Sequence, residues 1–174
     1  MNIFKKGIYT FALVICAPTI AQADVSMNFS GNLTIPQCTI NNNVDLTVPF
    51  NDVEIQTLIS ANTAYHTKEI LIPVNCPYSL GTPSISLVSS AVHEANSGSI
   101  QTSKYNEGLV VYIFKQDGVT PVPLGSQSDI SDSMSGTGSD RTLTLNAGVG
   151  RTGDMEDLTP GEFSASATMQ VVYK

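Results

Sequence analysis

Apolar and polar residues alternate with a period of two along most of this chain. Alternation of this kind places successive side chains on opposite faces of an extended strand, and no stretch keeps a period of 3.6 residues over three helical turns. Pairs such as Asp117-Gly118 and Pro160-Gly161 are turn signals between the alternating runs. The pattern predicts strands over residues 39–48, 68–75, 84–89, 109–115, 141–147 and 162–173.

Many short strands separated by turn signals predict an all-β fold, and specifically a β-sandwich of the immunoglobulin type. Tryptophan, usual in antibody domains, is absent from the 174 residues. The stretch 127–140 is rich in Ser, Gly and Asp, so we expect an exposed loop there. The chain has the length of one domain of ordinary size.

A further alternating run lies near the N-terminus, where Val25, Met27, Phe29, Leu33 and Ile35 form an apolar row interrupted only by Gly31. The run predicts a long strand with one buried face. Pro36-Gln37-Cys38 follows it directly, without a hairpin turn, so its pairing partner is expected elsewhere. A glycine inside a strand often marks the close approach of another backbone, although an ordinary bulge is an alternative reading of Gly31.

The C-terminal strand has the same alternation in Phe163, Ala165, Ala167, Met169, Val171 and Tyr173, and it runs to Lys174. No following segment covers its edge, and an uncovered apolar edge is an aggregation hazard. We therefore expect this strand to have a partner. The alternative is that the two alternating ends pair with each other inside one complete sandwich.

The first 23 residues have the features of an export signal. Lys5 and Lys6 precede an apolar stretch that ends in Ala21-Gln22-Ala23, a typical cleavage pattern. Cys16 permits the alternative of a lipoprotein signal. Without this segment, six basic side chains remain against fifteen acidic ones. Such an acidic chain would repel phosphate backbones, which argues against nucleic-acid binding.

Two cysteines, Cys38 and Cys76, remain after removal of the signal. They show no metal-binding or redox spacing, and disulfides persist in exported proteins. A disulfide closing this loop would stabilise the fold by roughly 4 kcal/mol in the chain-entropy model. Two buried free thiols are the alternative.

Signals of catalysis are weak. His66 and His93 stand alone, and the chain has no HExxH, GxSxG or Walker motif. A Ser-His-Asp set assembled only by folding stays open as an alternative. Residues 154–157 are acidic but lack the spaced oxygen ligands of a calcium loop. The sequence predicts no enzyme activity, no cofactor and no metal.

Three features together resemble pilins of the chaperone–usher pathway. The first is the alternating extension with a mid-strand Gly31, followed by Pro36 and the Cys38-Thr39-Ile40 segment. The second is the ending, with Tyr173 penultimate and Gly161 fourteenth from the end. The third is the segment 70–78, which is similar to the strand around the second cysteine of minor P-pilus subunits.

The resemblance implies an immunoglobulin-like sandwich that lacks its final strand and is completed by donor-strand complementation. Residues 1–23 would be a signal peptide, 24–36 a donor-strand extension and 37–174 the pilin domain. The donor residues would be Val25, Met27, Phe29, Gly31, Leu33 and Ile35. The strand that borders the groove and contacts the chaperone would comprise Gly161, Phe163, Ala165, Ala167, Met169, Val171, Tyr173 and Lys174.

The implied partners are a periplasmic chaperone, an outer-membrane usher and neighbouring pilins joined head to tail. The implied location is a surface pilus reached through the periplasm, and the implied role is a minor tip or adaptor subunit that supports cell adhesion. A major shaft pilin is one alternative, and a groove-blocked terminator is another. From a different class, a secreted carbohydrate-binding sandwich stays open, although Tyr65, Tyr78, Tyr105 and Tyr112 are not clustered in sequence.

Overall fold

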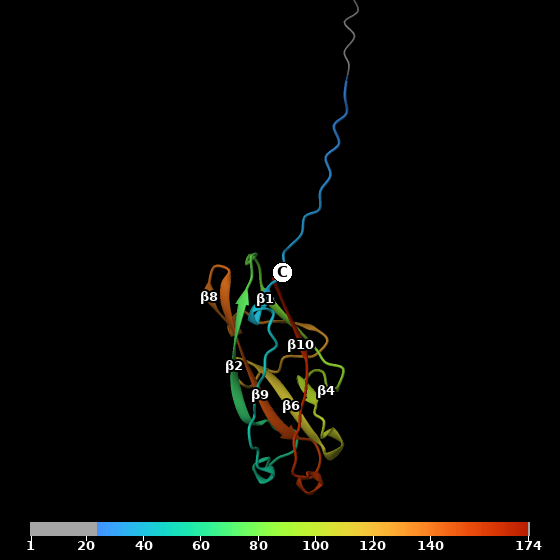
Figure 1. Cartoon of the computed structure of the whole chain (residues 1–174), viewed down its shortest axis with the longest axis vertical. Coiled ribbons are helices and arrows are strands. Elements are labelled where there is room, and N and C mark those ends of the chain that lie inside the picture. The colour runs from blue at the N-terminus through green and yellow to red at the C-terminus, as the bar shows by residue number, and fades with distance from the viewer. Residues whose placement is uncertain (1–23, 174) are drawn as a thin grey trace, which may run out of the picture. The chain divides into compact units, whose positions relative to one another are not determined.

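The computed structural model describes residues 24–173, which form strands, short 3-10 turns and connecting segments (Figure 1). By internal contacts the chain separates into residues 1–33 and residues 34–174. The predicted signal segment 1–23 and Lys174 lie outside the described residues. Within residues 24–173, no helix is long and apolar enough to cross a membrane.

Two antiparallel sheets make up the larger unit, as the all-β prediction requires. The larger sheet has the order β1-β2-β9-β6-β5-β4, with β8 paired to β9, and the smaller sheet has the order β10-β3-β7. The strands are β1 (Thr39–Ile40), β2 (Tyr65–Asn75), β3 (Pro83–Val88), β4 (Val92–Glu94), β5 (Ser99–Gln101), β6 (Leu109–Lys115), β7 (Gln127–Asp129), β8 (Met134–Thr137), β9 (Asp140–Arg151) and β10 (Thr168–Tyr173). The 3-10 turns are η1 (Asn41–Asn43), η2 (Ile55–Thr57), η3 (Tyr105–Glu107), η4 (Ser131–Ser133) and η5 (Met155–Asp157).

The main core lies between the two sheets. Alternate residues of β2, β9 and β3 point into it, and burial of these aliphatic side chains is the principal stabilising contribution. Its members include Ile72, Val74, Ile85, Leu87, Leu143, Leu145 and Val171. A second cluster, built on Leu58, Leu109, Val149 and Leu158, is packed by the half-buried rings of Phe50 and Phe163.

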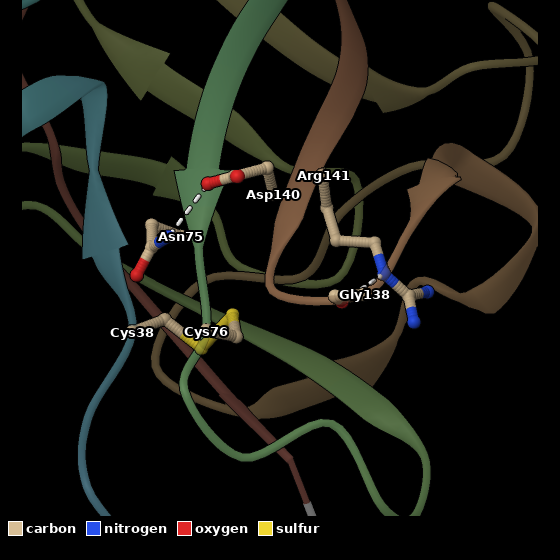
Figure 2. The surroundings of a disulfide bond; sticks show 6 residues. All are labelled: Cys38, Asn75, Cys76, Gly138, Asp140 and Arg141. Carbon is tan, nitrogen blue, oxygen red and sulfur yellow. Dashed lines mark hydrogen bonds between the residues drawn. A yellow bond between two sulfur atoms is a disulfide. The ribbon is translucent and has the colours of Figure 1, made fainter.

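The Cys38–Cys76 disulfide joins the start of β1 to the end of β2 (Figure 2). Asn75 Nδ2 donates to Asp140 Oδ1 at 2.6 Å beside it, and the Cys76 N–H donates to the Ser139 carbonyl at 2.8 Å. The predicted bridge is therefore present, and it ties the beginning of the domain to the β2–β9 pair.

The strand prediction for residues 109–115 coincides with β6, and those for 68–75, 84–89 and 141–147 overlap β2, β3 and β9. The loop prediction for 127–140 is wrong, because this stretch contains β7, η4 and β8 and buries Ile130 and Ser133 completely. Its polar composition reflects edge strands, which expose most of their side chains.

Two other strand predictions are wrong in extent. Of residues 39–48 only Thr39–Ile40 form a strand, because Asn41, Asn42 and Asn43 all have positive φ and end the pairing. Of residues 162–173 only Thr168–Tyr173 pair, with β3. The N-terminal run 25–35 forms no strand. Residues 162–167 and 25–35 have strand patterns but no neighbouring strand in the described chain.

Candidate strand-binding groove

A long open groove of about 1650 Å³ runs between two segments of the domain. Residues 43–56 line one side and residues 158–170 the other, and in Figure 1 these are the cyan-to-teal segment below β1 and the red segment leading into β10. Its volume exceeds the range of about 300–1,000 Å³ of small-molecule pockets. Its floor is apolar and is formed by Ile70, Ile72, Leu87, Ile100, Val111, Ile113, Leu145 and Ala147.

The first wall, residues 44–53, is an extended segment without a neighbouring strand. Within the described chain, none of its N–H groups from Asp45 to Val53 donates to a protein acceptor. Lys68 Nζ donates to the Pro49 carbonyl and holds this wall to β2. Val44 and Leu46 line the groove and are nevertheless exposed. The wall therefore has free main-chain groups beside an uncovered apolar surface.

The second wall comprises residues 162–173, and its first half, residues 162–167, is held from one side only. The Ser103 N–H donates to the Ser164 carbonyl at 2.8 Å, and the Ser164 N–H donates to Ser103 Oγ at 3.1 Å. Ser89 Oγ donates to the Ser166 carbonyl at 2.8 Å. In an extended chain, alternate residues direct their main-chain groups to opposite sides. The odd-numbered residues therefore direct theirs to the groove.

Those odd residues are unpaired on the groove side. The N–H groups of Phe163, Ala165 and Ala167 have no acceptor among residues 24–173. All three side chains, with that of Met169, line the groove. Since both walls leave main-chain groups free above an apolar floor, the geometry is that of a sheet with room for one more strand.

One end of the groove is narrowed by an aromatic pair. The ring centroids of Phe50 and Phe163, on opposite walls, lie 6.2 Å apart. At the same end, Glu107 accepts hydrogen bonds from the N–H of Thr159 at 2.8 Å, from the Thr159 hydroxyl at 2.9 Å and from Lys104 Nζ at 2.9 Å. The Thr159 N–H and then the Lys104 ammonium lower the pKa of Glu107 to about 2. This cluster anchors the chain at the start of the second wall.

At the C-terminal end of the second wall, the side chains pack into the core instead of lining the groove. Val171 and Tyr173 are buried in the main core. The Tyr173 hydroxyl is buried and has no hydrogen-bond partner among the described residues. The predicted row from Phe163 to Tyr173 therefore divides into four residues that line the groove and two that belong to the core.

The N-terminal run is exposed along its whole length. Its five large apolar side chains are exposed by 56–105%, and nothing lies within 4 Å of the position that a Cβ on Gly31 would occupy. The buried face expected for this run is thus absent in the single chain. A row of exposed apolar side chains of this length is expected to have a partner.

The two histidines make polar contacts in separate places. His66 Nε2 is 2.5 Å from Thr57 Oγ1, and His93 Nδ1 is 3.0 Å from the Tyr105 hydroxyl. Across residues 24–173, no three His, Cys, Asp or Glu side chains gather as a metal site would require. The acidic stretch 154–157 forms η5 and the residue before it.

Comparison with known proteins identifies the family. The model of the fimbrial protein family matches residues 27–174. The chain belongs to this family. The fimbrial protein PrsE of Escherichia coli is 34% identical to this fimbrial subunit over 153 residues, covering 85% of this chain and 84% of PrsE. The fimbrial adapter PapF of Escherichia coli is 29% identical over 153 residues, covering 87% of this chain and 89% of PapF.

The fold of this fimbrial subunit matches that of a solved chaperone–usher pilus chain with a TM-score of 0.61 at 21% identity, covering 91% of this chain and all of the other. The domain is accordingly an immunoglobulin-like sandwich that lacks a strand. The subunit is a pilin of the chaperone–usher class, exported through the periplasm and assembled in a surface pilus. Its family is a structural one and not an enzyme family.

Several groove residues were missed from the sequence. The wall 44–53 has such a signal in the alternation of Val44, Leu46, Val48 and Phe50, whereas the predicted strand covers residues 39–48 and does not indicate a groove wall. No sequence pattern indicated that Ser89 and Ser103 would hold the second wall, because their hydrogen bonds join residues 61 or more positions apart in the chain.

Proposed function

We propose that this subunit is a minor pilin, of the tip or an adaptor position, that polymerises by donor-strand exchange and supports cell adhesion. The observation that carries the proposal is the groove, with free main-chain groups on both walls and an apolar floor. A strand laid in it would pair with both walls and bury its alternate side chains. Residues 24–36 of each subunit would be that strand for a neighbour, and residues 37–174 would form the domain that receives one.

The donor residues are Val25, Met27, Phe29, Leu33 and Ile35, with Gly31 where the groove leaves least room. All five large side chains are exposed in the single chain. At about 1.5–3 kcal/mol for each, their burial would contribute roughly 7–15 kcal/mol before ordering costs. That magnitude is sufficient for a durable fibre.

A periplasmic chaperone would cover the groove before assembly, and an outer-membrane usher would direct the exchange. The chaperone would contact the strand from Gly161 to Tyr173 and the carboxylate of Lys174. This role requires no cofactor and no catalytic activity. The apolar lining of the groove supports a polypeptide strand as its occupant rather than a sugar.

Sequence likeness supports the minor position. The match to the adapter PapF extends over most of both chains, as does that to PrsE. The fold alone does not separate a minor subunit from a shaft pilin, because pilins at different positions share the same sandwich.

Replacement of Gly31 tests the donor strand. In the bacterium that assembles the pilus, Gly31→Leu is expected to reduce incorporation into surface pili at least tenfold, because a side chain enters the close strand contact. Co-purification with the chaperone should stay unchanged. The matched control is Asn32→Leu, which adds the same side chain to the opposite face of the strand and should incorporate normally. If chaperone capture falls together with incorporation, Gly31 does not act in the donor strand.

A further inference from the structure

A second, smaller cleft of about 310 Å³ lies beside the second wall, between this wall and the segments that begin β4 and follow β5. It is lined by Ala91, Gln101, Thr102, Ser103, Ser164, Ala165 and Ser166. Unlike that of the groove, its volume falls within the range of about 300–1,000 Å³ of small-molecule sites. The cleft opens where the pairing of β10 with β3 stops, at Thr168 and Val88.

Two hydrogen bonds fix the second wall across this cleft. The Ser103 N–H donates to the Ser164 carbonyl at 2.8 Å. Ser89 Oγ donates to the Ser166 carbonyl, also at 2.8 Å. Because both bonds use main-chain carbonyls of the wall, the side chains of Ser164 and Ser166 are left out of them.

The opposite side of the cleft is fixed as well. Gln101 Nε2 donates to the Val92 carbonyl at 2.9 Å, and His93 Nδ1 lies 3.0 Å from the Tyr105 hydroxyl. The second contact joins β4 to η3. The cleft is therefore formed before any ligand binds, which lowers the ordering cost of binding.

Several polar groups of the lining are free to bind a ligand. The hydroxyls of Ser164 and Ser166 make no hydrogen bond within residues 24–173. Ser103 Oγ accepts from the Ser164 N–H but donates to no group of the described chain, and the amide oxygen of Gln101 accepts from none. Each hydroxyl can donate one hydrogen bond and accept two.

The character of the lining restricts the ligand. None of the seven side chains carries a charge, so the cleft offers neither a cation for a phosphate or carboxylate nor carboxylates for a metal ion. Ala91 and Ala165 are too small to anchor a large apolar group. Neutral groups that both donate and accept hydrogen bonds match the hydroxyls of a neutral sugar, which do the same.

We propose that this cleft binds a neutral saccharide through the hydroxyls of Ser103, Ser164 and Ser166 and the amide oxygen of Gln101. The site is separate from the groove, because alternate side chains of an extended wall point to opposite faces. A subunit whose groove is filled can therefore still bind the sugar. For a single hexose unit we expect a Kd of about 1–10 mM, as is ordinary for so small a ligand.

The test is an NMR titration of the ¹⁵N-labelled full-length subunit with the methyl glycosides of glucose, galactose, mannose and N-acetylglucosamine. At least one should shift the amide signals of the cleft lining. Ser164→Ala with Ser166→Ala should weaken that binding at least tenfold, because two hydroxyls are lost. Ser90→Ala is the matched control and should bind as the parent does, since Ser90 is exposed and does not line the cleft.

A second variant tests the position of the site without removing a hydroxyl. Ala91→Leu fills the cleft and should abolish the shifts, while thermal unfolding confirms that the variant is folded. The inference is overturned if none of the four glycosides shifts the cleft signals, if binding survives Ala91→Leu or the double serine substitution, or if the acidic sugar N-acetylneuraminic acid binds more tightly than all four. These outcomes leave the donor-strand proposal unaffected, because Gly31→Leu tests it separately.

Discussion

Asn41, Asn42 and Asn43 turn the chain out of β1 with φ values of 45°, 53° and 60°. Left-handed backbone costs most residues about 1–2 kcal/mol, and asparagine tolerates it better because its side chain bonds locally. Asn41 does so here, since its Nδ2 donates to the Val44 carbonyl at 2.8 Å. The turn redirects the chain from the larger sheet to the first groove wall.

Asn42 allows the backbone effect to be measured alone, because its side chain is exposed and makes no hydrogen bond within the described chain. Asn42→Ala is expected to lower the free energy of unfolding by about 1 kcal/mol. Asn42→Gly should stay within about 0.5 kcal/mol of the parent, since glycine adopts positive φ freely. Urea unfolding of the three proteins measures both differences, and equal stability of the alanine and glycine variants would contradict the left-handed turn.

Tyr173 combines a buried ring with a hydroxyl that lacks a partner among residues 24–173. Tyr173→Phe is expected to leave the free energy of unfolding unchanged or raise it by up to about 1 kcal/mol, because an unsatisfied buried hydroxyl is removed. Tyr173→Ser removes the buried ring and should lower the free energy of unfolding by about 3 kcal/mol. It should also lower the amount of chaperone complex that is recovered. Thermal unfolding and co-purification separate the two effects. Poor chaperone capture of the phenylalanine variant would show that the chaperone supplies the missing partner.

At the scale of elements, the second wall is half strand and half unpaired segment. β10 pairs with β3 from Thr168 onward, whereas residues 162–167 are held through Ser103 and Ser89. η3 contributes the anchor at the start of this wall, where Glu107 holds Thr159. The wall is thus positioned at both ends, and its groove edge stays free to pair with an added strand.

The Glu107 anchor predicts a defined acid sensitivity. The folded pKa of Glu107 is about 2, below its ordinary value of 4.5. A carboxylate with a lowered pKa contributes stability above its unfolded pKa and loses it as the pH falls through the folded one. Glu107 should therefore stabilise the fold above pH 4.5 and lose that contribution between pH 4.5 and pH 2.

Glu107→Gln should flatten the dependence of unfolding free energy on pH in that window. Glu54→Gln is the matched control, because the Glu54 side chain is exposed and accepts no hydrogen bond in residues 24–173. Urea midpoints measured from pH 2 to pH 6 make the comparison. Identical profiles for Glu107→Gln and the parent protein would show that the anchor is not formed in solution.

At the scale of the whole molecule, the Cys38–Cys76 bridge closes a loop across 38 positions of the chain and ties the extension's attachment point to β2. The disulfide is expected to be important for the stability of an incomplete sandwich, because the missing strand leaves one side of the core uncovered. Cys38→Ser with Cys76→Ser is expected to destabilise the domain by about 4 kcal/mol. The measurement is the yield of folded subunit and its urea midpoint, with the parent protein under non-reducing conditions as control. A midpoint unchanged by the double substitution would contradict the prediction.

Some features followed from the sequence by itself. Local alternation determines strands wherever a neighbouring strand also exists, so β2, β3, β6 and β9 were predicted near their observed positions. The cysteine pair and the alternating apolar row 25–35 were also evident, because residue type and spacing define them. The resemblance to pilins depended on such local motifs.

Other features were decided only by the tertiary structure. Whether an alternating segment becomes a strand depends on a neighbouring strand that pairs with its main-chain groups, and residues 44–53 and 162–167 have no such strand among the described residues. The groove arises between these two segments, more than 100 residues apart in the chain. Alternation is a property of one segment, whereas the absence of a neighbour is a property of the fold, and the sequence therefore determined the strands but not the place where one is missing.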